Sequence, residues 1–229
     1  MSDGNKNIRL IIFDLGGVVV PEKSDWINSD IAEKLGVPLK EFMEIKNAFL
    51  SQLQTGKITL RDFYFSAMEA CSKHFNKTYT VTADDMVKFH IQKYIEYGNA
   101  DNVSPFKPVY MRIYNLLRGL HLNYRVVCLT NTELEIAEYN KNHLLADHLT
   151  LFEEFKDAYL STDLKMRKPS PSIYKYVLNK EVVAPQEAIF IDDNPEYVEA
   201  ARKLGIHAVL YKNVDQLIVE LRALGIRIS

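Results

Sequence analysis

The chain has 229 residues, with 28 Lys and Arg against 30 Asp and Glu, so its formal charge is −2. A nearly neutral chain without a basic tract lacks the charge that nucleic-acid binding requires, and we expect no nucleic-acid partner. No apolar run approaches the ~20 residues that span a bilayer, and the polar N-terminus holds no signal-peptide core, so we expect no membrane association and a cytoplasmic location.

The first predicted element is a strand over residues 10–13, a short Ile-rich apolar run without alternation. Such a run is typical of a strand that is covered on both faces of a sheet. Between residues 21 and 105 no clear strand appears, and four amphipathic stretches predict helices over 26–35, 39–53, 60–75 and 83–97. We interpret this segment as an all-helical insertion, and one larger mixed domain is the alternative.

Strands and helices alternate in the rest of the chain. The predicted strands cover 125–129, 188–191 and 207–210, with a weaker candidate at 157–160, and the predicted helices cover 109–120, 132–144, 172–178 and 195–204. This alternation predicts an α/β fold with a doubly wound, Rossmann-like parallel sheet. We expect residues 1–20 and 106–229 to form this core domain and residues 21–105 to form a helical cap domain.

Polar residues follow the predicted strands at the points where the strands end. These residues, with a lysine that precedes the helix at 172–178, are Asp14, Thr130, Asn131, Lys168, Asp192 and Asp193. In a doubly wound sheet the ligand binds outside the carboxyl ends of the strands, so we expect all six to face one crevice.

Three carboxylates in one crevice raise each other's pKa unless a cation holds them ionised. Oxygen ligands without His or Cys favour a hard ion, Mg²⁺ before Zn²⁺, and such an ion keeps positions open for phosphate oxygens. The hydroxyl, the amide and the lysine are the donors that a phosphoryl group needs. An aspartate beside a phosphoryl group can attack it and form an acyl phosphate that water later hydrolyses. The set of residues therefore indicates phosphoryl transfer.

Each of these residues also has an ordinary structural interpretation. Asp14 could form a turn, Thr130-Asn131 and Asp192-Asp193 could cap the helices that follow them, and Lys168 could lie in a solvated loop. The shared position of the residues at strand ends is what favours a functional site.

The order of these motifs resembles the haloacid dehalogenase superfamily of hydrolases. In that superfamily one strand ends in Asp-x-Asp-x-Thr/Val and a second ends in Ser/Thr, then a Lys follows, and a later strand ends in paired acidic residues. Here the motifs read Asp14-Leu15-Gly16-Gly17-Val18, Thr130-Asn131, Lys168-Pro169 and Asp192-Asp193. The strings "FDLGGV", "LTNT" and "FIDDN" are most similar to a capped phosphatase branch that includes bacterial glucose-1-phosphate phosphatases.

The resemblance implies a metal site and a nucleophile. Asp14 would be the nucleophile and a Mg²⁺ ligand, and Gly16 would give its backbone carbonyl to the metal. Asp193 would bind Mg²⁺ directly, with Asp192 binding it directly or through water.

The resemblance also implies a phosphate site. Thr130, with the backbone amides of Asn131 and Gly17, would hold the phosphoryl oxygens, and Lys168 would neutralise charge on Asp14 and on the phosphate. The implied activity is Mg²⁺-dependent hydrolysis of a small phosphorylated metabolite through an aspartyl-phosphate, with sugar phosphates among the candidate substrates.

One position departs from the superfamily's pattern. The phosphatases of the superfamily carry a second acid at this position, which transfers protons. This chain has Gly16 there, and losing a general acid–base catalyst costs ~10²–10⁴-fold in rate. A phosphatase with this glycine could relay protons through water or a cap residue, or it could be limited to good leaving groups such as acyl phosphates or anomeric phosphates. The alternatives to a phosphatase are a dehalogenase-type hydrolase that attacks carbon without Mg²⁺, and a non-catalytic module that binds a phosphorylated ligand. The paired Asp192-Asp193 argues against the first, and the intact Asp14 and Lys168 argue against the second.

The predicted cap offers two features that could face a substrate. Trp26 could belong to the cap core or form a wall of the substrate pocket. The turn at residues 54–57 could project toward the site or be an ordinary turn between helices. The histidines show no ligand spacing, so none is assigned to catalysis.

Overall fold

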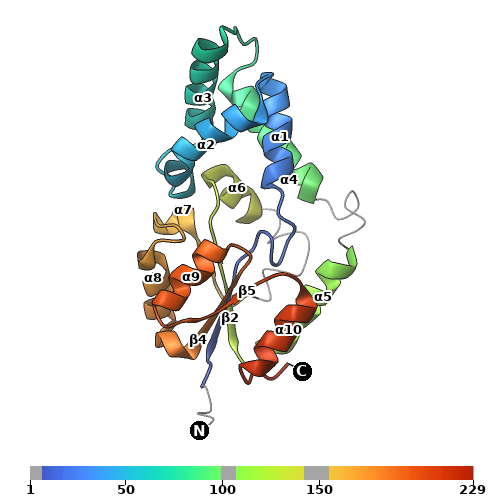
Figure 1. The fold of residues 1–229 in the computed structure, drawn as a ribbon, viewed down its shortest axis with the longest axis vertical. Coiled ribbons are helices and arrows are strands. Elements are labelled where there is room, and N and C mark those ends of the chain that lie inside the picture. The colour runs from blue at the N-terminus through green and yellow to red at the C-terminus, as the bar shows by residue number, and fades with distance from the viewer. Residues whose placement is uncertain (1–6, 99–106, 142–154, 229) are drawn as a thin grey trace.

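The computed structural model describes residues 7–98, 107–141 and 155–228. It contains a five-stranded parallel sheet in the order β3-β2-β1-β4-β5 (Figure 1). The strands are β1 (Leu10–Phe13), β2 (Arg125–Thr130), β3 (Ala158–Leu160), β4 (Ala188–Asp192) and β5 (His207–Leu210). The fold confirms the predicted α/β class with a doubly wound parallel sheet.

The register of the central strands places their carboxyl ends at one edge of the sheet. Phe13 of β1 pairs with Cys128 of β2 on one side and with Ile191 of β4 on the other. Asp14 and Asp192 are the residues that follow Phe13 and Ile191, so they leave neighbouring strands at the same level. Strand pairing therefore brings together carboxylates that lie far apart in the sequence.

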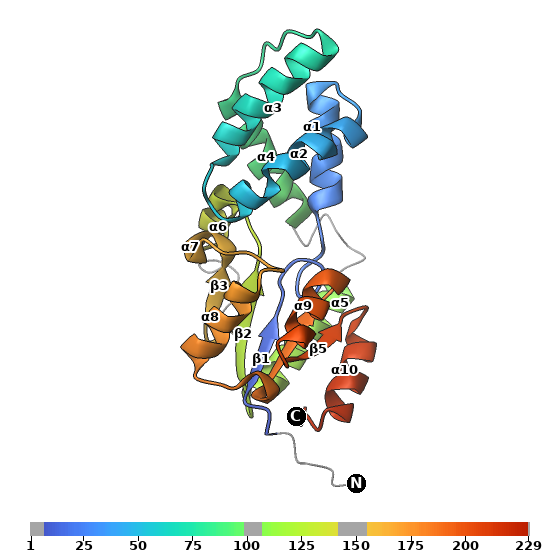
Figure 2. The same ribbon diagram turned by 60° about the vertical axis from the view of Figure 1, so that its left-hand side comes forward.

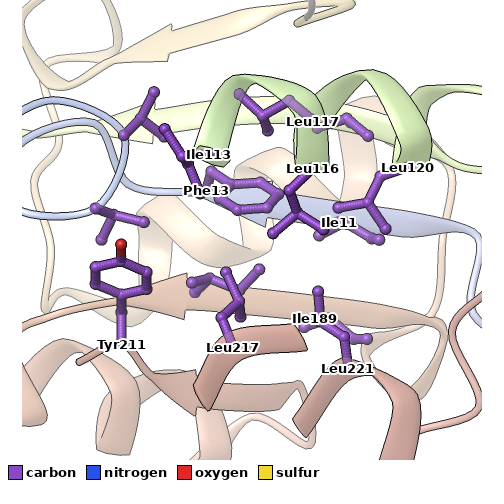
Figure 3. Close-up of a cluster of buried hydrophobic side chains, with 14 of the residues drawn as sticks. Ile11, Phe13, Ile113, Leu116, Leu117, Leu120, Ile189, Tyr211, Leu217 and Leu221 are labelled. Atoms are coloured by element: carbon purple, nitrogen blue, oxygen red, sulfur yellow. The ribbon is translucent and has the colours of Figure 1, made fainter. Parts of the chain in front are cut away.

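Helices cover both faces of the sheet because the strands are apolar on both sides. On one face, α5 (Lys107–His121) and α10 (Val214–Ala223) pack against Ile11 and Phe13 (Figure 3). On the other face, α8 (Pro171–Glu181) and α9 (Pro195–Lys203) belong to the cluster that contains Leu10 and Ile12. Every residue of β1 is fully buried, which explains the run of aliphatic side chains that predicted the strand.

Between β1 and α5 the described residues form four helices, which pack around a hydrophobic cluster separate from those of the sheet. They are α1 (Ser24–Leu35), α2 (Leu39–Gln54), α3 (Leu60–Phe75) and α4 (Ala83–Gly98). Figure 2 shows them at one end of the molecule, beyond the carboxyl ends of the strands. We call these four helices the cap; the domain boundaries at residues 20/21 and 105/106 stay a prediction.

The helix α6 (Leu134–Tyr139) follows β2 and joins the two parts of the molecule. Its residue Ile136 packs in the hydrophobic cluster of the cap, and the ring of Tyr139 lies edge-on to that of Tyr94 in α4. The sequence predicted a longer helix over residues 132–144, of which residues 142–144 lie outside the described part of the chain.

Three short or C-terminal elements were not predicted. They are α7 (Ser161–Leu164), a 3₁₀ turn at Pro185–Glu187 and α10. Of the helices in the described residues, none combines the length and the apolar character that crossing a membrane requires.

Candidate active site

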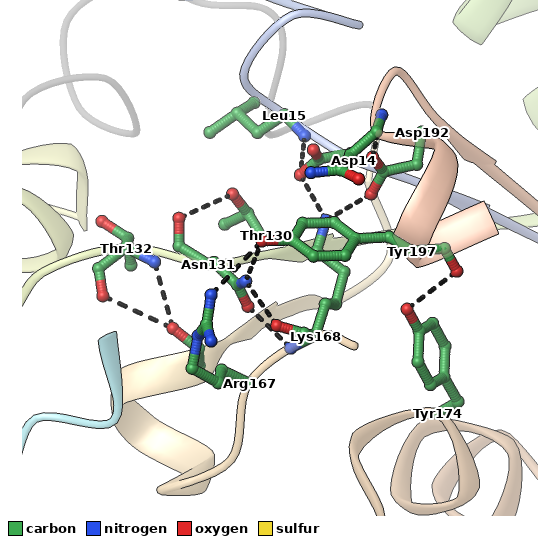
Figure 4. A network of polar contacts seen from close by, with 12 residues as sticks. Asp14, Leu15, Thr130, Asn131, Thr132, Arg167, Lys168, Tyr174, Asp192 and Tyr197 are labelled. Carbon is green, nitrogen blue, oxygen red and sulfur yellow. Dashed lines mark hydrogen bonds and ion pairs between the residues drawn. The ribbon is translucent and has the colours of Figure 1, made fainter. Parts of the chain in front are cut away.

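A buried lysine lies between two carboxylates at the ends of β1 and β4 (Figure 4). Nζ of Lys168 is 2.8 Å from Oδ1 of Asp14 and 2.6 Å from Oδ2 of Asp192. Lys168 and Asp192 are fully buried, and Asp14 is 8% exposed. One ammonium thus balances only one of the two carboxylates, and the group as a whole keeps a negative charge.

Asp193 adds a third carboxylate, and one oxygen each from Asp14, Asp192 and Asp193 lies within 4.8 Å of the others. Burial raises the pKa of Asp14 to about 6, against the lowering effect of Lys168. Burial also raises the pKa of Asp192 and that of Asp193, and negative neighbours add to both shifts. Burial opposes the charge on Lys168, but Asp14 and Asp192 together raise its pKa, so the lysine stays protonated.

The ligand atoms that this carboxylate cluster offers suit a hard divalent cation. All of them are carboxylate oxygens, close enough to share one ion, and Mg²⁺ and Ca²⁺ prefer such ligands. Burial and mutual repulsion raise the pKa values of the three carboxyl groups. A bound cation would supply positive charge and so hold the carboxylates ionised.

Gly17 lets the chain turn directly beside the carboxylates. Its φ is +77°, which favours glycine, and a Cβ at this position would lie 2.1 Å from Oδ2 of Asp193. Its backbone N–H donates to the carbonyl of Val20 at 2.8 Å, so the amide that we expected on the phosphate is engaged within the turn. Binding a phosphoryl oxygen through this N–H would require the bond to Val20 to be shared or exchanged.

Gly16 faces a carboxylate that the sequence did not point to. A Cβ at Gly16 would lie 3.1 Å from Oε2 of Glu22, in the segment that joins β1 to α1. The other oxygen of Glu22 accepts from the backbone N–H of Ser24 at 2.6 Å. Glu22 therefore occupies the space beside the position where the family's second acid is missing. Its linker has no periodicity or motif, so no sequence signal identified it.

Thr130 and Asn131 lie where β2 ends, as expected. Thr130 is 6% exposed, and the one hydrogen bond of its hydroxyl to another described residue is long, 3.5 Å to the carbonyl of Asn131. The side chain of Asn131 is already used: Nδ2 donates to the carbonyl of Lys168 at 3.0 Å, and Oδ1 accepts from the Lys168 N–H at 2.9 Å. The Asn131 side chain therefore positions Lys168.

A cavity of about 100 Å³ lies between this edge of the sheet and the cap. From the core it is lined by Gly16, Thr130 and Asn131, and from the cap by Lys46 and Tyr94, among others. This volume is small beside the ~300–1,000 Å³ typical of ligand pockets and suits a small metabolite. The carboxyl ends of β1 and β2 therefore open into a space that the cap covers.

The turn at residues 54–57 contacts the core next to the site. Oε1 of Gln54 accepts from Nε of Arg167 at 2.9 Å, and Arg167 directly precedes Lys168. Trp26 is 40% exposed and packs against the ring of Tyr97, with ring centroids 5.5 Å apart. The structure places Trp26 neither in the buried cluster of the cap nor among the described residues that line the cavity.

Sequence reasoning also missed three buried polar residues that line the cavity: Lys46 and His90 of the cap, and Lys23 directly before α1. Burial lowers the pKa of His90 to about 3, with a smaller effect from Lys46, so its ring is neutral. A polar residue on an amphipathic helix, or in the linker before one, gives no sign of which buried space it lines, so these three could not be singled out from the sequence.

Comparison with known proteins gives consistent results. A family model described as haloacid dehalogenase-like hydrolase matches residues 8–205. A D-ribitol-5-phosphate phosphatase of Bacteroides thetaiotaomicron is 23% identical over 211 residues, which are 90% of this chain and 93% of that protein.

Solved structures share the fold. A HAD-like family hydrolase from Porphyromonas gingivalis superposes with a TM-score of 0.69 at 24% identity, over 95% of this chain and 98% of the other. A HAD family enzyme from Bacteroides thetaiotaomicron, solved in complex with magnesium and inorganic phosphate, gives a TM-score of 0.64 at 23% identity, over 90% of this chain and 95% of the other.

Proposed function

This chain belongs to the haloacid dehalogenase-like hydrolases, and we propose that it is a Mg²⁺-dependent phosphatase that hydrolyses a small phosphomonoester through an aspartyl-phosphate on Asp14. The observation that carries the proposal is Lys168 between Asp14 and Asp192, with Asp193 completing a cluster of oxygen ligands. A cation held by these three carboxylates, together with Lys168, would make the adjoining site suited to a substrate that carries a phosphoryl group.

Asp14 attacks the phosphorus atom. Its Oδ1 accepts from the backbone N–H of Leu15 at 2.7 Å and from Lys168, and these two contacts orient the carboxylate. A bond forms between a carboxylate oxygen and phosphorus while the bond from phosphorus to the leaving oxygen breaks, and that oxygen takes a proton from solvent water. Water then attacks the phosphorus, which releases inorganic phosphate and restores the carboxylate.

The other residues hold the phosphoryl group during these steps. The hydroxyl of Thr130 and the backbone N–H of Asn131 donate to its oxygens, and the Gly17 N–H is a further donor once it exchanges its bond to the Val20 carbonyl. Lys168 neutralises charge on Asp14 and on the phosphoryl oxygens. Asp14, Asp192, Asp193 and the Gly16 carbonyl would hold Mg²⁺, which would supply positive charge to the phosphoryl group.

The curated relative supports this proposal over attack on carbon, whereas the solved structures of similar fold include both a magnesium–phosphate complex and a 2-haloacid dehalogenase. One relative is a D-ribitol-5-phosphate phosphatase, and one structural neighbour was solved with magnesium and inorganic phosphate. A carbon-attacking enzyme does not need a metal, and three carboxylates within 4.8 Å would then repel each other without a function.

The test is a phosphate-release assay over a panel of small phosphomonoesters, with Mg²⁺ and with a chelator, beside a chloride-release assay over short chloroacids. We expect phosphate release that needs Mg²⁺ and no chloride release. Chloride release without Mg²⁺ would instead favour the carbon-attacking mechanism, and no turnover in either assay would favour a binding module.

A further inference from the structure

The cavity that adjoins the strand ends carries two lysines on its far side. Lys46 comes from α2 of the cap, and Lys23 comes from the segment that leads into α1. The same cavity is lined by Gly16 and Thr130, so a substrate with its phosphoryl group at the strand ends would extend toward these lysines.

Lys46 is buried, and the described part of the chain offers it no counter-ion. It is 7% exposed, and its Nζ donates to Oδ1 of Asn28 at 2.9 Å. An ammonium group has three protons to donate, and this contact uses one of them. Within residues 7–98, 107–141 and 155–228, no carboxylate oxygen lies within 4.0 Å of this Nζ. Burying an unpaired charge is costly, so an arrangement of this kind suits a ligand that supplies the missing anion.

Lys23 is in the same situation. It is 8% exposed, and its Nζ lies 4.3 Å from the centroid of the Tyr94 ring, whose hydroxyl donates to Oδ1 of Asn140 at 2.9 Å. Burial lowers the pKa of Lys23 to about 8, and the charge of Glu22 offsets only part of this effect. Across the described ranges this ammonium also lacks an ion pair.

Two carboxylates line the cavity as well, but neither neutralises the lysines at close range. Glu22 faces Gly16 and accepts from the Ser24 N–H, and Glu133 directly precedes α6. Neither forms an ion pair with Lys23 or Lys46. Both lysines therefore line the space that the non-reacting end of a substrate would fill, without an ion pair to either carboxylate.

We propose that Lys46 and Lys23 form an anion subsite for the non-reacting end of the substrate, so that the enzyme selects phosphomonoesters that carry a second anionic group, a carboxylate or a second phosphate. This inference rests on the proposed phosphatase function, because it takes the phosphoryl group to lie at the strand ends. The small cavity limits the substrate to a short carbon chain between the two anionic groups.

The test compares three short substrates of similar size: phosphoglycerate, propanediol bisphosphate and glycerol phosphate. The wild-type enzyme is expected to show a kcat/KM about 10-fold or more higher for one of the two doubly anionic substrates than for glycerol phosphate, as expected for charge-assisted hydrogen bonds. Which of the two is preferred identifies the second group as carboxylate or phosphate. Equal kcat/KM values for all three substrates would overturn the subsite and leave the phosphatase proposal standing.

Variants tie the preference to the lysines. Lys46→Met and Lys23→Met should each reduce the ratio of kcat/KM values toward one, mainly through KM, whereas Lys46→Arg keeps the charge and should keep most of the preference. Lys40→Met, on the exposed side of the same helix as Lys46, is the matched control and should leave the ratio unchanged. A preference that survives in both Met variants would also overturn the subsite. If the wild type releases phosphate from no phosphomonoester, the proposed function itself fails.

Discussion

The Nζ of Lys168 lies 2.8 Å from Oδ1 of Asp14, so a fully buried lysine holds the carboxylate that we propose as the nucleophile. The same Nζ lies 2.6 Å from Asp192, which makes Lys168 the only cation among the described residues that forms ion pairs with both carboxylates.

Replacing Lys168 by Met leaves two buried carboxylates without their cation. We expect this variant to lose activity by ~10²-fold or more, as for removal of a group that stabilises transition-state charge. We also expect it to lose ~3–5 kcal/mol of stability without metal, the usual cost of breaking a buried ion pair. Phosphate-release rates and chemical denaturation measure the two effects. Lys165→Met, at a nearby exposed lysine, is the control, and a Lys168→Met enzyme within tenfold of wild type would contradict the assigned role.

The three carboxylates make the stability of the metal-free protein depend on pH. The folded-state pKa of Asp14, about 6, lies above its ordinary value of 3.8, mainly because of burial. The folded protein therefore holds this proton more tightly than the unfolded chain, and the corresponding stability, present below about pH 4, is lost as the pH rises through about 6.

Mg²⁺ should reverse this loss, since a cation that binds only the folded state stabilises it. We expect Mg²⁺ to raise the thermal midpoint by a few degrees at pH 7.5 and by clearly less at pH 5, where protons compete for the carboxylates. Thermal unfolding with Mg²⁺ or a chelator at both pH values measures the effect. A response to Mg²⁺ that is equal at the two pH values would count against a metal site at Asp14.

Gly16→Asp restores the acid that this chain lacks. The new Cβ would lie 3.1 Å from Oε2 of Glu22, an exposed side chain whose end can move. We expect this variant to keep or raise its activity on alkyl phosphates, whose leaving groups need a proton, relative to aryl phosphates. The double variant Gly16→Asp, Glu22→Gln removes the repulsion between the two carboxylates and should be at least as active. A large loss in both variants would show that the glycine itself is required.

Gly17→Ala is a contrasting change one residue further on. The φ of +77° and the 2.1 Å approach to Asp193 leave no room for a methyl group. We expect a stability loss of about 1 kcal/mol or more together with weaker Mg²⁺ binding, because Asp193 must move. Denaturation and a Mg²⁺ titration of activity test this, and unchanged Mg²⁺ affinity would separate the turn from the metal site.

Most of the sheet could be predicted from sequence because its strands are short apolar runs that are buried on both faces. The predicted bounds of β1 and β5 agree with the structure, and those of β4 differ only by including Asp192. The helix α10 was missed, although Asn213 caps it by accepting from the N–H of Gln216 at 2.9 Å. Its apolar side chains pack against the sheet. No predicted strand follows it, so the alternation of strands and helices did not indicate a helix there.

Of the site residues, those at or next to the ends of strands could be predicted from the sequence. Asp14 and Asp192 meet because strands β1 and β4 pair, which follows from the order of elements in this fold. Lys46 and Glu22 depend on how the cap lies over the core, a long-range packing that leaves no local pattern in the sequence. The prediction of a longer helix after β2 likewise could not show that Ile136 packs into the cap.

The most direct test of the central claim is to trap the covalent intermediate on Asp14. The enzyme is mixed with a hydrolysed phosphomonoester and Mg²⁺, quenched in acid within one turnover, digested and analysed by mass spectrometry. We predict one phosphoryl group on the peptide that contains Asp14, absent when a chelator replaces Mg²⁺ and absent in a folded Asp14→Asn variant. A phosphoryl group on another residue, or full phosphatase activity in Asp14→Asn, would contradict the proposed mechanism.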